Sequence, residues 1–335
     1  MQKILITGAC GFIGHHLVEH VLKNTDWDIV GLDRLDGTST FNRITDFEIW
    51  DESKHRIKMV WHDLKAPINE YVSAEIGKVD YIIHLAASSH VNRSIEYPME
   101  FVMDNVVGTC NLLDYARTVK DIQKVVYFST DEVFGPAPDN VEYKEWDRYR
   151  ASNTYAASKA GGEELAIAYE NTYKLPVIIT HCMNVFGERQ HPEKFLPMLV
   201  KKILFDEEVI IHSDPTRTKS GSRFYIHARD VSDCLLYLLN HETNNGDKFN
   251  IRGYREVDNL ELAQLVAKIM NKPLKYQMVD FHSSRPGHDL RYALDGQKVK
   301  DLGWEPKLPF EERLEKCVKW MVNRPKWLLI NNKNS

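Results

Sequence analysis

Three glycines near the start of the chain, Gly8, Gly11 and Gly14, separate a short apolar run from an amphipathic stretch. The run at residues 3–7 is typical of a buried strand, and residues 12–22 have the apolar spacing of a helix. The first glycine permits a tight turn, the second lets the backbone approach a pyrophosphate, and the third lets the helix pack on the strand. The chain is therefore expected to begin with a strand, a tight turn and a helix.

The first half of the chain continues this alternation of short apolar runs with amphipathic stretches. Strands that are apolar on both faces indicate a parallel sheet covered by helices. The pattern predicts an α/β fold with a doubly wound parallel sheet of the Rossmann type. The expected strands are residues 4–7, 28–32, 57–61, 81–85, 124–129 and 177–180, with helices at 12–22, 99–119 and 155–173.

The rhythm changes after residue 180, where prolines and a loop rich in Ser, Thr, Gly and Lys interrupt the pattern. Shorter elements follow, with helices expected at 231–240 and 259–270 and a strand at 248–251. We expect a nucleotide-binding domain at residues 1–180 that also takes residues 222–245. Residues 181–325 would form most of a second, smaller α/β lobe, discontinuous in sequence, and residues 326–335 a tail.

Asp33 ends the second expected strand, about 20 residues beyond the glycine loop. A carboxylate at this position can bind both ribose hydroxyls of NAD and would repel the 2′-phosphate of NADP, although the adjacent Arg34 would soften that preference. The helix amides, beginning at Phe12 and Ile13, would face the pyrophosphate. These residues predict an NAD site; the alternative is an ordinary strand–turn–helix with a surface aspartate.

Asp63 and Leu64 follow the third expected strand. Asp63 could accept a hydrogen bond from the adenine amino group of the cofactor. It could equally serve as the N-cap of a helix. The sequence leaves both interpretations open.

Tyr155 and Lys159 lie four residues apart on an expected helix, so their side chains share one face. A nearby ammonium favours the phenolate and lowers the pKa of a tyrosine, which makes it usable as a base near neutral pH. Most such pairs are simple surface pairs. This one gains weight because it follows the glycine loop and the fifth strand.

Together these features resemble the extended short-chain dehydrogenase/reductase superfamily, and within it the dTDP-glucose 4,6-dehydratases. The similarity is densest at the end of the fifth strand, where open α/β sheets place ligands. It covers nearly all of residues 2–325. The stretches that carry it are 129–135 (STDEVFG), 84–87 (HLAA), 89–94 (SHVNRS), Asn105 with 108–109 (GT), 182–187 (CMNVFG), 192–194 (PEK) and 285–289 (RPGHD).

The resemblance implies a role for each residue of the catalytic set. Tyr155 would take the proton of the C4 hydroxyl of a hexose, Thr130 would hold that oxygen, and Lys159 would grip the nicotinamide ribose. Glu132 would then remove the C5 proton and Asp131 would protonate the departing C6 hydroxyl. The alternative for the acidic pair is a capping carboxylate that begins a solvated turn.

The resemblance also implies a tightly bound, recycled NAD and a nucleotide-diphosphate sugar as substrate. Ala86 and Ala87 would join the cofactor site. An arginine can clasp a diphosphate with two donors, although a lone arginine is more often a surface charge. The matching substrate positions are Ser89, His90, Asn184, Glu193, Lys194, Arg223, Arg285 and His288. For His90 a structural, hydrogen-bonded role is at least as good an interpretation.

Three departures from the family pattern leave the nucleotide base and the sugar configuration open. Ser88 and Asn92 stand where acids are usual, and Phe186 replaces a tyrosine. The loop at residues 213–226 is longer and more basic than its counterpart. A 4-epimerase or UDP-glucuronate decarboxylase would use the same oxidation at C4 without needing Asp131 and Glu132. A non-catalytic NAD-sensing protein is a third alternative.

Composition narrows the remaining classes of function. A formal net charge of -5 gives no sign of a nucleic-acid partner. The five scattered cysteines favour a reducing cytoplasm over a disulfide framework, and no His/Cys/Asp cluster has metal-ligand spacing. We see no signal peptide and no membrane span. By resemblance we expect a homodimer joined through the helices at 99–119 and 155–173.

Overall fold

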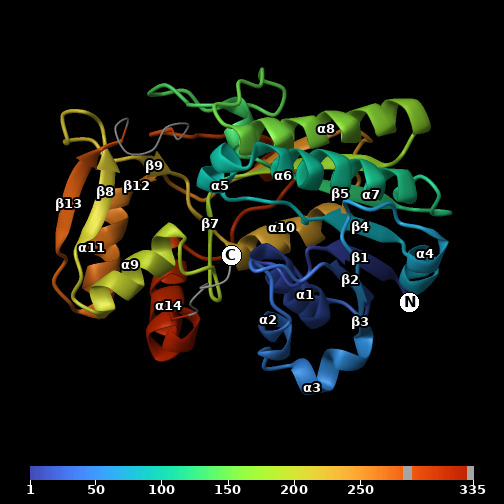
Figure 1. Ribbon diagram of the computed structural model, residues 1–335, viewed down its shortest axis with the longest axis horizontal. Helices are drawn as coiled ribbons and strands as arrows, with labels where there is room; N and C mark the ends of the chain where they lie inside the picture. Colours follow the sequence, from blue (N-terminus) through green and yellow to red (C-terminus); the bar gives the residue numbers. More distant parts are fainter. Residues whose placement is uncertain (282–288, 330–335) are drawn as a thin grey trace.

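The computed structural model describes residues 1–281 and 289–329. Its centre is a seven-stranded parallel sheet in the order β11-β6-β5-β4-β1-β2-β3 (Figure 1). The predicted doubly wound sheet is confirmed. Its strands are β1 (Lys3–Thr7), β2 (Asp28–Asp33), β3 (Ile57–Trp61), β4 (Tyr81–His84), β5 (Lys124–Thr130), β6 (Val177–Cys182) and β11 (Lys248–Ile251).

The strand order reverses at β1, which pairs with β2 on one side and with β4 on the other. Thr7 therefore stands opposite both Leu32 and His84. The carboxyl ends of β1, β2 and β4 meet at this switch point, which is where open α/β sheets bind ligands. On the other side Thr130 of β5 pairs with Cys182 of β6.

Helices cover both faces of the sheet. On one face α1 (Phe12–Asn24) packs with α10 (Ala228–Asn240) in one apolar core. The other face is covered by α4 (Glu70–Ile76), α7 (Gly108–Ala116) and α8 (Thr154–Tyr173), which share a second core (Figure 1). In both layers the helices turn their apolar faces toward the sheet.

The helix predicted at 99–119 is confirmed as one continuous helical stretch that contains a π-helical turn. It consists of α6 (Pro98–Val102), the π-helical turn (Met103–Val107) and α7, and it ends at Ala116. The turn places the buried Asn105 so that its amide bonds the backbone of Ser88 and the hydroxyl of Ser158. A π-turn at such a site re-aims a side chain that a regular helix would misplace.

A second, smaller α/β lobe lies beside the sheet domain, at the left of Figure 1. Its core is formed by three helices and a parallel strand pair. These are α9 (Phe195–Leu204), α11 (Asn259–Met270), α14 (Phe310–Asn323), β8 (Val209–Ser213) and β13 (Tyr276–Asp280). Short pairs complete it: β7 (Val185–Phe186) with β10 (Ile226–His227), and β9 (Ser222–Arg223) with β12 (Val257–Asp258).

The remaining elements are short. They are α2 (Asn42–Thr45), α3 (Trp50–Ser53), α5 (Val91–Glu96), α13 (Gln297–Asp301) and 3₁₀ turns at Lys54–Arg56, Asp131–Phe134 and Pro325–Trp327. Within residues 1–281 and 289–329, no helix has the length and apolar character to cross a bilayer. The division into domains at residues 180 and 325 stays a prediction; β11, at 248–251, extends the main sheet.

Candidate active site

The glycine loop has the geometry of a phosphate cradle. Gly8 adopts φ +68°, and a Cβ there would lie 2.9 Å from the backbone nitrogen of Ala86. A Cβ on Gly14 would lie 2.0 Å from the carbonyl oxygen of Gly8, so the helix can approach the turn this closely only because residue 14 is glycine. No side chain caps the start of α1 at Gly11. The first-turn amides can therefore bond an anion, which fits a dinucleotide pyrophosphate.

Asp33, at the end of β2, holds the loops around this cradle. One carboxylate oxygen accepts from the Cys10 amide at 2.9 Å, and the other accepts from the Leu35 amide and the Ser39 hydroxyl, both at 2.9 Å. Arg34 is paired with Asp104 at 2.6 Å and with Asp36. Because its charge is already met by two carboxylates, it offers little to a 2′-phosphate.

Asp63 is not the N-cap of a helix: a turn follows it, and the next helix, α4, is capped by Asn69. Its carboxylate accepts from the Lys65 amide at 3.0 Å and its side chain is 38% exposed, and the adenine contact stays a prediction. Leu64 packs in the core beneath α7. Ala86 is fixed at the end of β4, where its amide donates to the hydroxyl of Thr7 at 3.1 Å. Ala87 follows it at the same edge of the sheet.

The acidic pair begins a 3₁₀ turn directly after β5. Thr130 donates from its hydroxyl to one oxygen of Asp131 at 3.0 Å and caps the turn through the Glu132 amide. Asp131 is 4% exposed, and its other oxygen has no partner among the described residues. Glu132 accepts from the side-chain amide of Asn153 at 3.0 Å and lies 3.4 Å from the hydroxyl of Tyr292.

Helix α8 brings the tyrosine–lysine pair to the same place. Asn153 caps its start by accepting from the Ala156 amide, so one residue positions both the helix and Glu132. Lys159 is buried, donates to the carbonyl of Phe128 at 2.6 Å and lies 4.5 Å from the ring centre of Tyr127. Thr130, Glu132 and Asp131 all influence the pKa of Tyr155, which places the phenol beside the acidic turn.

The charges of this cleft are strongly perturbed by burial. Burial and the negative charge of Glu132 raise the pKa of Asp131 to about 7. Burial also raises the pKa of Glu132, while the hydrogen bond from Asn153 lowers it. Burial lowers the pKa of Lys159 to about 7, and the charge of Glu163 opposes that shift. Such shifts are what acid–base chemistry at neutral pH requires.

The expectation that Lys159 lowers the pKa of Tyr155 is wrong. The pKa of Tyr155 is raised, not lowered, because the phenol is buried and faces the carboxylates of Glu132 and Asp131. Lys159 does not offset this, since its ammonium points to the Phe128 carbonyl. Local helix spacing identified the pair but could not reveal the burial around it.

Four of the expected substrate residues lie together at one edge of the cleft. Lys194 lies 3.4 Å from the carbonyl of Ser89, and Glu193 lies 3.5 Å from His90, so these four share one edge of the cleft. Asn184 is exposed beside β7. His90 also caps α5, which is the structural role weighed above.

Arg223 is held more firmly than a surface charge would be. Its guanidinium donates at 2.6 Å to the carbonyls of Ser222, Asp289 and Leu290 and lies 4.5 Å from the ring centre of Tyr292. Its positive charge opposes the rise that burial causes in the pKa values of Asp131 and Glu132. The expected positions Arg285 and His288 lie outside the described residues.

Known proteins of one family are similar to this chain over nearly its whole length. The family model described as GDP-mannose 4,6 dehydratase matches residues 5–317. The chain belongs to this family. A dTDP-glucose 4,6-dehydratase of Salmonella typhimurium is 34% identical to it, over 100% of this chain and 96% of the relative. The resemblance to the NAD-dependent epimerases and dehydratases is thereby confirmed.

Solved structures of the same superfamily match along the whole chain. A dTDP-glucose 4,6-dehydratase from Streptomyces venezuelae, solved with NAD, superposes with a TM-score of 0.87 at 31% identity, covering 98% of this chain and 99% of that one. A UDP-glucuronic acid 4-epimerase from Bacillus cereus gives a TM-score of 0.86 at 26% identity, covering 96% and 100%. Dehydratases and epimerases thus share this scaffold.

Two residues of the cleft in this dehydratase-family member were not predicted from the sequence. Asn153 is the N-cap of α8, and an asparagine directly before a helical pattern was the available signal. Tyr292 reaches Glu132 and also donates to Asp289 at 2.6 Å. No local pattern indicated it, because it arrives from a segment far along the chain.

Described residues include no group of three or more His, Cys, Asp or Glu that could hold a metal ion.

Proposed function

We propose that this chain is an NAD-dependent nucleotide-hexose 4,6-dehydratase, acting on a sugar of the dTDP-glucose or UDP-glucose type. It would convert the substrate to the nucleotide-linked 4-keto-6-deoxyhexose. The observation that carries the proposal is the acidic pair, buried Asp131 and half-buried Glu132, in the same cleft as Thr130 and Tyr155. An oxidation at C4 alone needs the tyrosine; loss of water needs an acid and a base as well.

The first step prepares the sugar for elimination. The proton at C5 of a hexose is not acidic until C4 becomes a ketone. Tyr155, as its phenolate, removes the proton of the C4 hydroxyl, and Thr130, beside it, holds the oxygen. Because burial and the neighbouring carboxylates raise the pKa of Tyr155, the phenolate forms most readily when those carboxylates are neutralised.

Elimination of water then uses one carboxyl as the acid and the other as the base. Asp131, with a pKa of about 7, keeps a proton that it can give to the departing C6 hydroxyl. Glu132 accepts a hydrogen bond from Asn153, which favours its ionised form, and takes the C5 proton. Two adjacent carboxyls with different environments can hold opposite protonation states.

The residues present fit NAD. The uncapped amides of α1, the close approach of Gly8 and Ala86, and the carboxylate of Asp33 suit its pyrophosphate and ribose. Phe12, Ile13, Asp63, Leu64 and Ala87 complete the proposed set, with Tyr155 and Lys159 at the nicotinamide end. When bound, NAD supplies the hydride acceptor for C4 and the donor for C6. Because the overall reaction is redox-neutral, the cofactor stays bound and is reused.

The substrate would lie between the two lobes, with its diphosphate toward Arg223. That guanidinium is rigidly held and positively charged in a cleft of carboxylates, which suits a phosphate rather than a neutral sugar. Ser89, His90, Glu193 and Lys194 share one edge and would contact the sugar and the base, with Asn184 nearby. Arg285 and His288 complete the proposed set by resemblance.

The test is incubation of purified protein, without added NAD, with dTDP-glucose, UDP-glucose, GDP-mannose and UDP-glucuronate separately. Mass analysis of the products should show loss of one water from one of the first three. That result would establish dehydration, a retained cofactor and the carrier together. An isomerised product of unchanged mass, resolved by NMR, would instead make the protein an epimerase.

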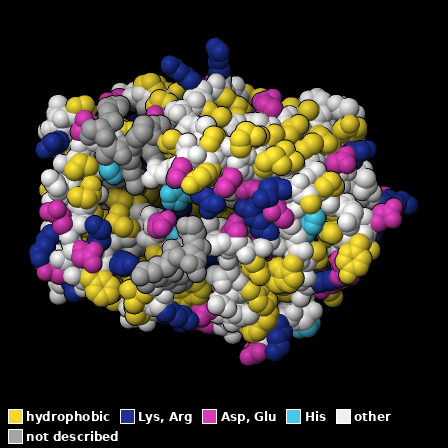
Figure 2. Space-filling model, viewed as in Figure 1, with side chains coloured by type: hydrophobic (Ala, Val, Ile, Leu, Met, Phe, Trp, Pro, Cys, Tyr) yellow, Lys and Arg dark blue, Asp and Glu magenta, His cyan; other side chains and the backbone are white. Residues whose placement is uncertain are grey.

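We also propose a homodimer that joins through the helices at 99–119 and 155–173. Large apolar side chains on and before α6 are exposed, among them Ile95 (45%), Tyr97 (47%) and Met99 (66%). Figure 2 shows hydrophobic side chains gathered over the region of α6, α7 and α8. Apolar patches of this kind are typical of subunit interfaces.

Sedimentation equilibrium tests the homodimer. The protein should sediment as a dimer, and Met99→Glu should shift it toward the monomer because a charge would be buried in the interface. Tyr71→Glu, at a 75% exposed position on α4, is the matched control and should remain dimeric. A wild-type monomer, or a Met99→Glu dimer of unchanged affinity, would contradict the proposed interface.

We further propose that the enzyme works in the cytoplasm on small molecules, without a nucleic-acid partner. The five cysteines are unpaired, which fits a reducing compartment, and the net charge is -5.

A further inference from the structure

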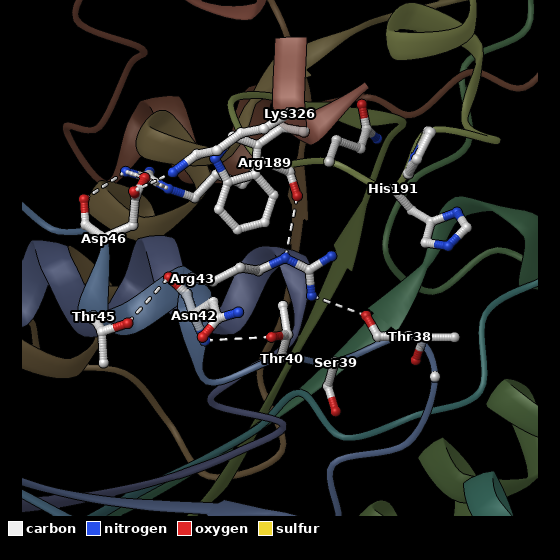
Figure 3. Close-up of a pocket in the computed structure, with 14 residues that line it drawn as sticks. Thr38, Ser39, Thr40, Asn42, Arg43, Thr45, Asp46, Arg189, His191 and Lys326 are labelled. Carbon is white, nitrogen blue, oxygen red and sulfur yellow. Dashed lines mark hydrogen bonds and ion pairs between the residues drawn. The ribbon is translucent and has the colours of Figure 1, made fainter. Parts of the chain in front are cut away.

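A cavity of about 470 Å³ lies beside the cofactor cradle and contains none of the proposed catalytic residues. It is formed where three segments meet: the loop and helix after β2, the loop after β7, and the 3₁₀ turn near the end of the described chain (Figure 3). Its lining residues are Gly37, Thr38, Ser39, Thr40, Asn42, Arg43, Thr45, Asp46, Arg189, Gln190, His191, Pro192, Lys326 and Trp327.

Arg43 places a fixed positive charge on the wall of this cavity. It is 4% exposed, and its guanidinium donates to the carbonyls of Cys10, Thr38 and Arg189 at 2.8 to 3.1 Å. These bonds use Nε and Nη1, and Nη2 has no partner among the described residues. In Figure 3 this end of the side chain faces the open space toward His191. Burial lowers the pKa of Arg43 to about 10, so it remains charged at neutral pH.

The other charges of the cavity do not neutralise Arg43. Asp46 is the one acidic residue among those that line it. Its carboxylate is already paired with Arg189 at 2.9 Å and with Lys326 at 3.0 Å (Figure 3). Three cations therefore surround a single anion. A guanidinium nitrogen that the protein leaves without a partner and that is accessible from the cavity can donate to an anion there.

The rest of the lining is largely polar. Thr38, Ser39, Thr40, Asn42 and Thr45 supply hydroxyls and an amide. A lining that offers both donors and acceptors suits a ligand with hydroxyls as well as a charge.

We propose that this cavity binds a phosphorylated, hydroxyl-rich small molecule, a sugar phosphate or a nucleotide, with its phosphate on Arg43. A bare phosphate ion would leave most of the volume unfilled, whereas cavities of about 300–1,000 Å³ are usual for small organic ligands. A phosphate accepts well from a guanidinium, and the hydroxyls of the ligand would meet the polar lining. The site is independent of the proposed dehydration, since it shares no residue with the catalytic set.

The cavity touches both loops that the active site uses. Ser39 lines it and also donates to Asp33, and the backbone of Cys10 joins Arg43 to the glycine loop. On the other side, His191 and Pro192 lead directly to Glu193 and Lys194. For this reason the test is run on NAD-saturated protein, so that binding in the cavity is separated from binding in the cofactor cradle.

Calorimetric titration tests the proposal with four probes: inorganic phosphate, glucose 1-phosphate, thymidine monophosphate and uncharged glucose. One of the two phosphorylated organic probes should bind, and glucose should not; which one binds identifies the body of the ligand. Arg43→Gln should weaken that binding about ten-fold or more, because a charge-assisted hydrogen bond is lost.

Two milder variants keep the proposal falsifiable where Arg43→Gln fails to fold. Lys326→Gln should weaken binding about two- to five-fold, as removal of an exposed charge does. Asp46→Asn should strengthen it by a similar factor, because Arg189 and Lys326 lose their carboxylate partner. Lys58→Gln is the matched control: it removes an exposed lysine charge away from the cavity and should change nothing.

Two results would overturn the proposal. One is a set of affinities that is the same in the wild type, Lys326→Gln and Asp46→Asn proteins, since binding would then occur elsewhere, as at the sugar-nucleotide site. The other is binding that disappears when NAD is saturating, because the cavity would then be part of the cofactor site. Neither result bears on whether the protein dehydrates its sugar substrate.

Discussion

Asp131 carries the most informative proton of the cleft. Its carboxyl is buried, one of its oxygens is unpartnered, and its pKa is raised from 3.8 to about 7. A raised carboxyl pKa means that the folded protein holds the proton more tightly than the unfolded chain does. Stability from this group is complete below pH 3.8 and is lost as the pH rises through about 7.

Asp131→Asn should therefore stabilise the protein in a pH-dependent way. The neutral amide pays no ionisation cost, so the gain in melting temperature over wild type should be a few degrees larger at about pH 8 than at about pH 5. Thermal unfolding at both pH values measures it. Asp51→Asn, at an exposed position, is the control and should show no such trend. An equal effect at both pH values would contradict the raised pKa.

At the scale of single residues, candidate residues could be named from the sequence, but their pKa shifts and anchoring contacts could not. Gly8, Gly14 and Asp33 could be predicted because their roles follow from local backbone requirements. The direction of the Tyr155 pKa shift could not, since it depends on burial beside Glu132. The anchoring of Arg223 on the backbone at 289–290 likewise depends on distant parts of the chain.

At the scale of elements, α8 is tied to β6 and β11 by a buried charge cluster. Glu163 of α8 is fully buried and contacts Lys248 of β11 at 2.8 Å, His181 of β6 at 3.1 Å and the hydroxyl of Tyr149. Glu163 lies one helical turn beyond Lys159 and opposes the burial that lowers its pKa. The cluster thus fixes the helix that carries the tyrosine–lysine pair.

Glu163→Gln should destabilise the fold by about 3–5 kcal/mol, because Lys248 would be left as an unpaired buried charge. The double variant Glu163→Gln with Lys248→Met should recover most of that loss, since both charges are removed together. Denaturant unfolding of the wild type, the two single variants and the double variant measures the difference. A double variant as unstable as the sum of the single variants would show that the two side chains do not act as a pair.

The elements that could be predicted are those with a strong local pattern. The central strands were found because they are apolar on both faces, and α11 because its apolar spacing is regular. The π-helical turn at Met103–Val107 could not be predicted from the sequence, because it accompanies the contacts of Asn105 with the distant residues Ser88 and Ser158. The pairing of β8 with β13 joins segments far apart in the chain and leaves no local signal.

At the scale of the whole molecule, the proposed chemistry depends on three separate segments meeting at one edge of the sheet. The turn after β5 brings Asp131 and Glu132, α8 brings Tyr155, and the segment at 289–292 brings Tyr292 to Glu132. The central claim is that Tyr155 acts as the base in the oxidation at C4, whereas Asp131 and Glu132 act as acid and base in the elimination of water. These two functions can be separated by mutation.

The most direct test is a single-turnover measurement on the double variant Asp131→Asn with Glu132→Gln, using the sugar nucleotide that the wild type dehydrates. Reduced-nicotinamide absorbance should rise and persist, because Tyr155 can still take the C4 hydroxyl proton while the hydride passes to NAD, and mass analysis should show no loss of water. Formation of the 4-keto-6-deoxy product at the wild-type rate would contradict the assignment of Asp131 and Glu132.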